Sequence, residues 1–301
     1  MRSRWLLPLL TVLLLVALAT GVGALVRGPS SNASPLRPVP NLAFFSPAMP
    51  NRPAVVWAVG DSDGSDSSRA VARRIAADRP TRLLYLGDVY DSGSIEDFRD
   101  NYDPVYGGLG RITAPTPGNH DWPAHSEGYD RYWRARTGAP TPPWYALRVG
   151  GWRIISLNSE APHGHGSAQL RWLESKLRRS RGTCTLAFWH RPLESAGQHG
   201  DQPDVAPFWN ALRGRATLVV NGHDHDLQRL RPRHGITQLV AGAGGKSHYR
   251  LGQDERVVFG DDRRDGALRM ALRPGRAELA FVAADGAVLD RSKAKCSTAR
   301  S

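Results

Sequence analysis

Short apolar runs in this chain are repeatedly followed, with no spacer, by a turn that carries Asp, Asn or His. Apolar runs of this length are typical of buried strands. In an open α/β sheet the carboxyl ends of parallel strands meet at one edge, so side chains placed there are brought together by the fold. The five turns read GDSDG at 60–64, GDVYDSG at 87–93, GNHD at 118–121, HRP at 190–192 and NGHDH at 221–225.

The spacing of apolar residues predicts an α/β fold. Strands are expected at 54–59 and 82–86, and an amphipathic helix at 67–78. A second helix is expected at 168–179, because Leu170, Leu173 and Leu177 form an apolar stripe. After residue 221 the pattern changes to strands and turns. The sequence therefore predicts one α/β domain with an added all-strand portion, and we place it at 53–301.

Asp, Asn and His together are suitable ligands for borderline cations such as zinc, iron or manganese. A site for two such ions also needs a carboxylate that reaches both of them. One Gly-Asp pair is usually a turn, and one His after a strand is usually structural. Five such turns in order, the last containing His-x-His, indicate a metal site.

The five turns resemble the motifs of the calcineurin-like metallophosphoesterases, over residues 60–225. Within that superfamily the chain is most similar to the purple acid phosphatase branch and its short bacterial relatives. The stretch FRDNYDPVY at 98–106 and the closing strands with a terminal Cys carry that likeness. The resemblance implies a two-sheet αββα sandwich. It also implies hydrolysis of phosphate esters by a hydroxide held between two metal ions, with Fe, Zn and Mn all open as the metals.

The resemblance also assigns roles residue by residue. It places six ligands around the two ions, with the bridging carboxylate shared between them. Asp61 and His225 would bind the first ion, Asn119, His190 and His223 the second, and Asp88 both.

Two departures from the family pattern concern the first ion. Many members have a His where Asp63 stands here. Purple acid phosphatases have a Tyr three residues after the bridging Asp, whereas here Asp91 holds that place and Tyr90 comes one residue early. Tyr90 and Asp63 are candidate metal ligands in addition to the six. Asp91 is a candidate catalytic residue that orients His120, as an Asp at that place does in the protein Ser/Thr phosphatases.

Three further residues are expected to act on the substrate. His120, next to Asn119, is the candidate general acid for the leaving alkoxide, because the pKa of a histidine lies near neutrality. Asn119 and His199 are expected to contact the substrate.

The N-terminus has the features of an export signal. Arg2 and Arg4 precede an apolar run from Trp5 to Val26. Residues 1–27 are interpreted as a signal peptide or an uncleaved membrane anchor, and both place the remainder outside the cytoplasm. A Pro- and Ser-rich linker is expected at 28–52. The protein is therefore expected to be secreted or anchored to the membrane on its outer side.

Charge and cysteine usage limit the partners. The chain has 40 basic and 28 acidic residues and a formal net charge of +12. Because the arginines are spread along the sequence, the favoured interpretation is solvated surface charge, and no specific nucleic-acid site is evident. Contact with a membrane is expected only through the N-terminal segment. Cys184 and Cys296 are the two cysteines, and a disulfide between them is favoured over two separate thiols.

These features together predict an exported phosphoesterase with two metal ions, acting on a phosphate-ester substrate as a phosphomonoesterase. One alternative with the same chemistry is a phosphodiesterase or nucleotidase. An alternative of another class is a non-catalytic cell-surface binding protein that kept the fold. The presence of all six ligands favours an enzyme.

Overall fold

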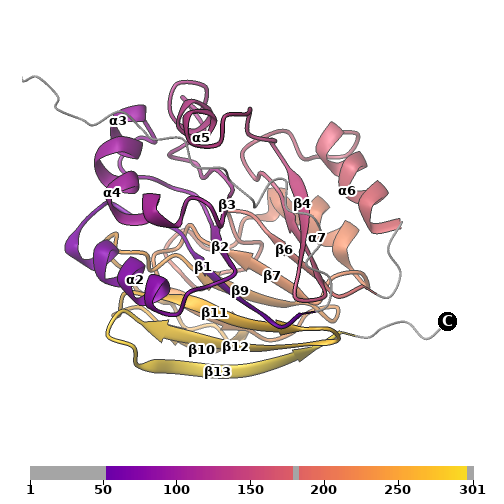
Figure 1. The fold of residues 1–301 in the computed structure, drawn as a ribbon. Coiled ribbons are helices and arrows are strands. Elements are labelled where there is room, and N and C mark those ends of the chain that lie inside the picture. Colours follow the sequence, from indigo (N-terminus) through magenta and orange to yellow (C-terminus); the bar gives the residue numbers. More distant parts are fainter. Residues whose placement is uncertain (1–51, 179–182, 297–301) are drawn as a thin grey trace, which may run out of the picture. The chain divides into compact units, whose positions relative to one another are not determined.

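The computed structural model describes residues 52–178 and 183–296, which form two mixed β-sheets with helices outside them (Figure 1). The predicted N-terminal segment and nearly all of the linker lie outside the described residues. The first sheet has the order β13-β12-β11-β1-β2-β3. Its strands are β1 (Ala54–Val59), β2 (Arg82–Tyr85), β3 (Thr113–Pro115), β11 (Gly266–Arg273), β12 (Arg276–Ala283) and β13 (Val288–Lys295).

The second sheet has the order β10-β8-β9-β7-β6-β5-β4. Strands β1, β2 and β3 are parallel in the first sheet, and β5, β6, β7 and β9 are parallel in the second. The strands of the second sheet are β4 (Tyr145–Val149), β5 (Trp152–Ser156), β6 (Thr185–Phe188), β7 (Leu218–Asn221), β8 (Leu227–Leu230), β9 (Thr237–Ala241) and β10 (Val257–Asp261).

Helices cover the outer faces of both sheets. One group consists of α2 (Asp66–Ala77), α3 (Ile95–Asp97), the π-helix η1 (Phe98–Tyr102), α4 (Asp103–Tyr106), the 3-10 turn η2 (Gly107–Leu109) and α5 (Tyr129–Thr137). The other group consists of α6 (Ala168–Arg178), the 3-10 turn η3 (Pro203–Val205) and α7 (Ala206–Leu212). Helix α2 begins where the Ser65 side chain accepts a hydrogen bond from the Ser68 amide, as an N-cap residue does.

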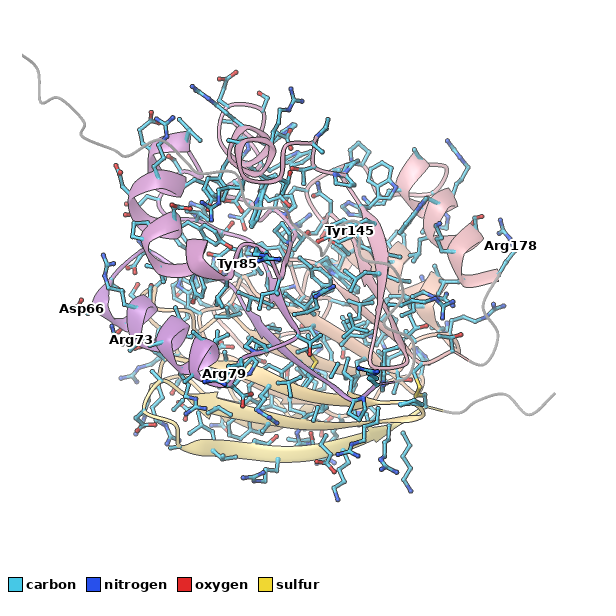
Figure 2. The ribbon with its side chains drawn as sticks, in the orientation of Figure 1. Asp66, Arg73, Arg79, Tyr85, Tyr145 and Arg178 are labelled. Atoms are coloured by element: carbon cyan, nitrogen blue, oxygen red, sulfur yellow. A yellow bond between two sulfur atoms is a disulfide. The ribbon has the colours of Figure 1, made fainter. Side chains whose placement is uncertain are left out.

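Three apolar clusters hold these layers together. One lies between the two sheets, one joins the first sheet to α2–α5, and one joins the second sheet to α6 and α7. Leu170, Leu173 and Leu177 are buried in the last of these, as the helical stripe predicted. Figure 2 places Tyr85 and Tyr145 inside the stack, whereas Asp66 and Arg178 lie at its surface. The αββα sandwich predicted from the sequence is confirmed.

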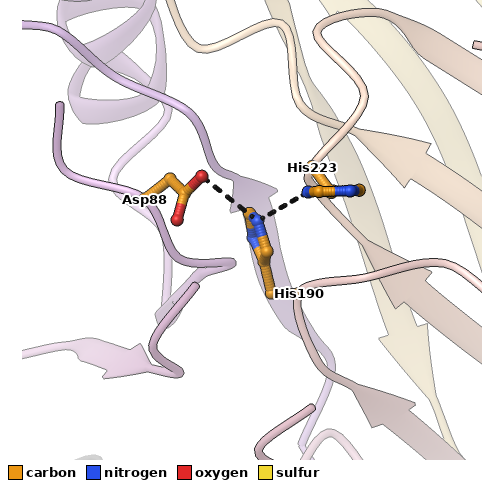
Figure 3. Close-up of side chains that lie close together, drawn as sticks. All are labelled: Asp88, His190 and His223. Carbon is orange, nitrogen blue, oxygen red and sulfur yellow. Dashed lines mark hydrogen bonds and ion pairs between the residues drawn. The ribbon is translucent and has the colours of Figure 1, made fainter. Parts of the chain in front are cut away.

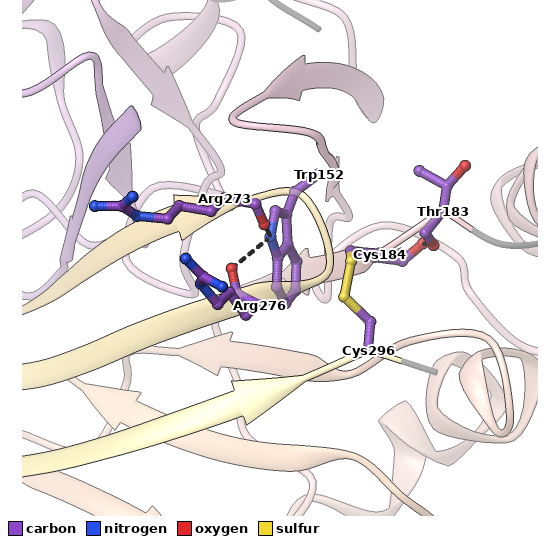
Figure 4. Close-up of a disulfide and its surroundings, with 7 residues drawn as sticks. Trp152, Thr183, Cys184, Arg273, Arg276 and Cys296 are labelled. Carbon is purple, nitrogen blue, oxygen red and sulfur yellow. Dashed lines mark hydrogen bonds between the residues drawn. A yellow bond between two sulfur atoms is a disulfide. The ribbon is translucent and has the colours of Figure 1, made fainter. Parts of the chain in front are cut away.

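The disulfide between Cys184 and Cys296 is also confirmed (Figure 4). Cys184 lies just before β6 of the second sheet, and Cys296 follows β13 of the first sheet. The bond therefore ties the end of the described chain to the opposite sheet. Within the described ranges, none of the helices has the length and apolarity that crossing a bilayer requires.

Candidate metal centre

The turns identified in the sequence meet at the carboxyl ends of the parallel strands. Asp61 follows β1, and its main-chain N–H donates to the carbonyl of Gly87, in the turn after β2, at 3.0 Å. The N–H of Gly222, after β7, donates to the carbonyl of His190, after β6, also at 3.0 Å. Each sheet therefore fixes two of the turns side by side. The two pairs of turns are joined where the N–H of His223 donates to Asp61 Oδ2 at 3.0 Å.

The centre of the site is the group Asp88, His190 and His223, all buried (Figure 3). Their potential ligand atoms lie within 4.8 Å of one another. His190 Nε2 lies 3.3 Å from Asp88 Oδ2, 3.2 Å from His223 Nδ1 and 3.0 Å from Asn119 Oδ1. Because His190 Nδ1 donates to the Leu86 carbonyl at 2.8 Å, Nε2 is the nitrogen presented to a ligand. A second hydrogen bond of this kind is the usual way to orient a metal-binding histidine.

Asp61, Tyr90 and His225 form the other half of the site. His225 Nδ1 donates to the Ser247 carbonyl at 2.8 Å, so its Nε2 also faces the site. That Nε2 lies 2.7 Å from the Tyr90 hydroxyl and 3.8 Å from Asp61 Oδ1. The Tyr90 hydroxyl in turn lies 3.1 Å from Asp88 Oδ2. The one-residue shift of this tyrosine is therefore absorbed by the loop, and the hydroxyl reaches the candidate ligands.

The backbone of the site is strained in a way that brings these groups together. Asp61, Asp88 and His223 have positive φ angles of 66°, 58° and 75°. Residues other than glycine rarely adopt this conformation, and such residues cluster at functional sites. Gly118 and Gly222 give the carboxylates room, since an added Cβ would lie 2.0 Å from Asp88 Oδ1 and 2.6 Å from Asp61 Oδ2.

The buried carboxylates of the site are placed to receive a cation. Asp61 Oδ1 is buried without a hydrogen-bond partner. Burial raises the pKa of Asp61 well above its usual value, and nearby Asp88 raises it further against the opposing charge of His190. Burial opposes ionisation of Asp88 as well, but His190 outweighs it and lowers the pKa of Asp88 to about 2. The same pairing, working against burial, raises the pKa of His190 to about 10. A proton on His190 thus supplies the positive charge that a metal ion would bring.

The other two histidines are already in the form that binds metals. Burial, reinforced by the charge of His190, lowers the pKa of His223 to about 2. Burial likewise lowers the pKa of His225 to about 4. Neutral imidazole is the ligand form of histidine. The donor set of carboxylates, imidazoles and one amide oxygen, with an unpartnered carboxylate oxygen among them, fits two borderline cations.

His120 lies at the edge of the site with one nitrogen fixed. Its main-chain N–H donates to Asp88 Oδ1 at 2.9 Å, and its Nδ1 lies 2.6 Å from the main-chain carbonyl of Asp91. The Asp91 carboxylate is exposed and bonds Lys246 Nζ at 2.6 Å. The expectation that the Asp91 side chain orients His120 is therefore corrected. The main-chain carbonyl does so, because the side chain points away to Lys246.

Asp63, the other candidate metal ligand, is bonded to the start of α2. Its Oδ1 accepts hydrogen bonds from the Ser65 N–H at 3.1 Å and from the Ser68 hydroxyl at 3.2 Å. Both donors belong to the start of α2. These bonds hold the short side chain against the start of α2, whose N-cap is Ser65, and Asp63 is not part of the group formed by Asp88, His190 and His223.

His199 lies beside the candidate ligands. Its ring centroid is 4.2 Å from that of His223 and 5.0 Å from that of Tyr249. Its Nδ1 lies 3.2 Å from buried Asp224 Oδ1, and its N–H donates to the same oxygen at 2.9 Å. A partly exposed histidine held in this way at the rim is suitably placed for the predicted contact with a substrate.

Asp121 is a site residue whose role the sequence did not reveal. It belongs to the GNHD turn, yet its carboxylate points inwards and accepts from main-chain N–H groups: Asp88 and Gly118 at 2.8 Å, and Val89 at 3.0 Å. It therefore fixes the loop that presents the Asp88 carboxylate. Tyr249 was also missed, and its ring stacks on His225 with centroids 4.0 Å apart. The Gly-rich stretch AGAGGKS at 241–247, just before Tyr249, was the sequence signal that could have pointed to this part of the site.

A sandwich of this architecture with carboxylates and histidines at its strand ends defines the metallophosphoesterase class of metal-dependent phosphoester hydrolases. A sequence model of the calcineurin-like phosphoesterases matches residues 54–227, more than half of the chain. The chain belongs to the calcineurin-like phosphoesterase family. Members depend on two metal ions, which is the cofactor predicted from the sequence, and Fe, Zn and Mn all remain compatible with the donors.

The chain is similar in sequence to acid phosphatases. The chain is 24% identical to rat tartrate-resistant acid phosphatase type 5 over 213 residues, which cover 59% of this chain and 65% of the relative. It is 24% identical to the probable purple acid phosphatase 20 of Arabidopsis thaliana over 232 residues, which cover 67% of this chain and 51% of the relative. The matched region thus spans about half to two thirds of these proteins.

The fold is also that of a solved purple acid phosphatase. PPD1 from yellow lupin seeds superposes with a TM-score of 0.70 at 16% identity, covering 82% of this chain and 54% of the lupin chain. At this identity the likeness concerns the fold. The predicted kinship with the purple acid phosphatase branch is confirmed.

Proposed function

We propose that this chain is an exported phosphomonoesterase that hydrolyses phosphate esters with two bound metal ions. The observation that carries the proposal is the convergence of candidate ligands from five separate turns on Asp88, next to the unpartnered Asp61 Oδ1. Two bound cations of this kind supply Lewis acidity towards a phosphate ester and the means to activate water near neutral pH.

The side chains divide between the two ions according to their positions. One group comprises Asp61 and His225, and the other comprises Asn119, His190 and His223. The Tyr90 hydroxyl and His190 Nε2 both lie near Asp88 Oδ2, at 3.1 and 3.3 Å, which supports Asp88 as the carboxylate shared by both ions. The Tyr90 hydroxyl lies with the first group. The proposed ligands are Asp61, Tyr90 and His225 for one ion, Asn119, His190 and His223 for the other, and Asp88 for both.

Protonation of the leaving group is assigned to His120. Its Nδ1 donates to the Asp91 carbonyl, so in the protonated ring the proton that can be transferred is the one on Nε2, and the ring is left neutral after the transfer. A histidine fixed at one nitrogen holds the other at a defined position, which general acid catalysis requires. His199, oriented by Asp224, and Asn119 are assigned to substrate binding.

Three observations support export and a monoester substrate. The predicted signal or anchor at 1–27 favours transfer across a membrane. The disulfide suits an oxidising compartment. Two relatives are named acid phosphatases. A phosphodiesterase or nucleotidase would use the same ligands, and the assay below separates it from a monoesterase.

The test is turnover by metal-stripped protein after addition of Mn, Zn or Fe. We expect hydrolysis of an aryl phosphate monoester to exceed that of the corresponding bis-ester. Asp88→Ala should lower the monoester rate about 100-fold or more, because a ligand to both ions is lost. Asp130→Asn, a change in a half-exposed carboxylate that bonds His125, is the matched control and should keep full activity.

Each alternative has its own outcome in this assay. Preference for the bis-ester would replace the monoesterase by a phosphodiesterase. The absence of turnover with every metal would favour a binding protein on this fold.

A further inference from the structure

Part of the outer face of the first sheet is not covered by helices. Helices α2–α5 pack over β1, β2 and the adjoining end of β11. Strands β12 and β13 continue the sheet beyond these helices, whose apolar cluster reaches β12 only at Ala280 and Val282 and leaves the outer side of β13 uncovered (Figure 1). Their inner side faces the core through Leu279, Phe281 and Ala294. Alternate residues of each strand must therefore point outwards, towards solvent.

The outward residues of these strands are mainly basic. In β11 the inward positions Leu268, Met270 and Leu272 alternate with Arg269 and Arg273. The register places Arg269, Ala280 and Arg291 in one row across the three strands, and Glu278 beside Lys293. We call this set the outer basic face: Arg269, Arg273, Arg276, Arg291, Lys293 and Lys295, with Glu278 among them; Asp290, the other carboxylate on the three strands, pairs with Phe281 in an inward row and bonds Arg229.

Few of these charges are neutralised. Arg269 Nε bonds Asp78 at 2.7 Å, and Glu278 lies opposite Lys293 in the register. Five of the six basic side chains are exposed. Small apolar residues, Ala271 and Ala280, lie between them, and Val288 is one of two large exposed apolar side chains in the described part of the chain. The face is thus flat, positively charged and partly apolar.

Two shallow hollows lie on this face and share Arg269 and Arg291. One, of about 300 Å³, is lined by these residues together with Arg74, and by Trp57, Ala280, Val282, Gly286 and Val288. The Nε of Arg74 is buried and has no hydrogen-bond partner. The other hollow, of about 280 Å³, is also lined by Glu278 and Lys293. Three arginines around one hollow with an apolar wall favour an anion attached to an apolar body, because guanidinium groups bind phosphate oxygens well.

The position of the face leaves the metal centre free. Arg273 follows Leu272, which pairs with Ala54 at the start of β1. The Asp61 turn follows the other end of that six-residue strand, about 20 Å away. The chain before Ala54 contains the apolar segment predicted as a signal or anchor, and it joins the domain at the Arg273 end. A surface bound near Arg273 would not obstruct the site.

We propose that the outer basic face binds the surface of an anionic phospholipid bilayer. Cations near such a surface each strengthen binding about fivefold. A second copy of the chain does not fit, because two such faces would bring like charges together. Nucleic acid is a poorer fit, because no aromatic side chain is among the large exposed apolar residues of the described ranges, and base stacking on aromatic rings is absent from this face. The proposal changes the expectation that membrane contact comes only through the N-terminal segment.

The test uses the full chain with an environment-sensitive fluorophore. Glu278→Cys places the probe on the outer basic face, and Glu174→Cys places it on exposed α6 as the control. The native cysteines are paired and do not compete for the label. Vesicles of phosphatidylcholine are compared with vesicles that also contain phosphatidylglycerol. Phosphatidylcholine alone sets the baseline for any binding through the N-terminal segment.

We expect the probe at 278, and not at 174, to shift to the blue with phosphatidylglycerol, and added NaCl to reverse the shift. Arg291→Ala with Lys293→Ala should raise the lipid concentration for half response about 30-fold, and Lys293→Gln alone about fivefold. Arg134→Ala with Arg213→Ala removes the same charge from exposed positions elsewhere and should change nothing. Unchanged melting temperatures show that the variants are folded.

Three outcomes would overturn the proposal. These are an equal response to both kinds of vesicle, an equal response at 174, or a half-response concentration that the double variant leaves unmoved. A response to duplex DNA without vesicles would assign the face to nucleic acid instead. A response to inorganic phosphate alone would assign the hollow to a soluble anion.

Discussion

Asp121 allows a quantitative prediction about how the bridging carboxylate is held in place. Its two oxygens accept three main-chain hydrogen bonds, from Asp88 and Gly118 at Oδ2 and from Val89 at Oδ1. Asp121→Asn keeps the shape but replaces one acceptor oxygen by an NH₂ group. If the amide oxygen keeps the two bonds at Oδ2, the Val89 N–H is left facing a donor.

The cost of that change follows from the burial of the group. A hydrogen bond to a neutral acceptor contributes about 0.5–1.5 kcal/mol, and a buried donor left without a partner costs about 1–3 kcal/mol. We therefore expect Asp121→Asn to lower the free energy of unfolding by about 1.5–4.5 kcal/mol. Burial and the charge of Asp88 raise the pKa of Asp121 to about 7, so ionisation of this carboxyl opposes folding, and the comparison is made at about pH 6, where the carboxyl is mostly neutral in the folded state.

The assay is urea unfolding followed by tryptophan fluorescence, with EDTA present so that bound metal does not contribute. Asp130→Asn, at a half-exposed carboxylate that bonds His125, is the control and should change stability by less than about 0.5 kcal/mol. If Asp121→Asn costs no more than this control, with equal denaturant slopes, the hydrogen bonds to Asp121 do not hold the loop and the reasoning is refuted.

Three other changes give further tests. His120→Ala should lower the rate of the chemical step about 100-fold or more while metal content stays the same, as measured by single-turnover kinetics and elemental analysis; an unchanged rate contradicts its role. The disulfide between Cys184 and Cys296 closes a loop of 112 residues, and its reduction should lower the free energy of unfolding by about 3–5 kcal/mol in the denaturant assay. A loss below about 1 kcal/mol would show that the disulfide does not restrain the unfolded chain. The hydrogen bond to Asp265 raises the pKa of His248 above its usual value of about 6.5, so the folded state holds that proton more tightly than the unfolded chain does. This contribution to stability is fully present below about pH 6.5 and is lost as the pH rises through the folded-state pKa of His248. The difference in unfolding free energy between wild type and His248→Gln should therefore shrink over that range. A difference that grows with pH would contradict the assignment.

The part of the site that was predicted from sequence is the part carried by local patterns. Apolar runs before Asp61, His190 and His223 became β1, β6 and β7, because buried parallel strands are continuous apolar segments. Gly118 and Gly222 beside the candidate ligands are explained by the space that the carboxylates occupy. Each of these signals lies within a few residues of the group it positions.

What could not be predicted depends on contacts between distant segments. The sequence does not show that Asp121 turns inwards, or that Asp63 accepts a hydrogen bond from the Ser68 hydroxyl of α2. The place of the Tyr90 hydroxyl depends on the path of its loop beside His225, which the one-residue shift left open. The family motifs show that such residues are present, but they do not show which atoms of each residue make contacts in the site.

The arginines show the same limitation on a larger scale. Along the chain they look evenly spread, which favoured ordinary surface charge. The antiparallel pairing of β11, β12 and β13 gathers Arg269, Arg276 and Arg291 on one side of a sheet. The alternation at Arg291, Lys293 and Lys295 was a local signal of an outward-facing strand side, but the sequence alone does not show which strands lie beside it.

The most direct test of the metal centre is an anomalous difference map from crystals of the full chain grown with Mn²⁺. Two peaks are expected, about 3.5–4 Å apart as in two-metal sites, one on each side of the Asp88 carboxylate. The first should lie next to Asp61 and His225, and the second next to His190 and His223. A single peak, or two peaks that do not share Asp88, would contradict the account.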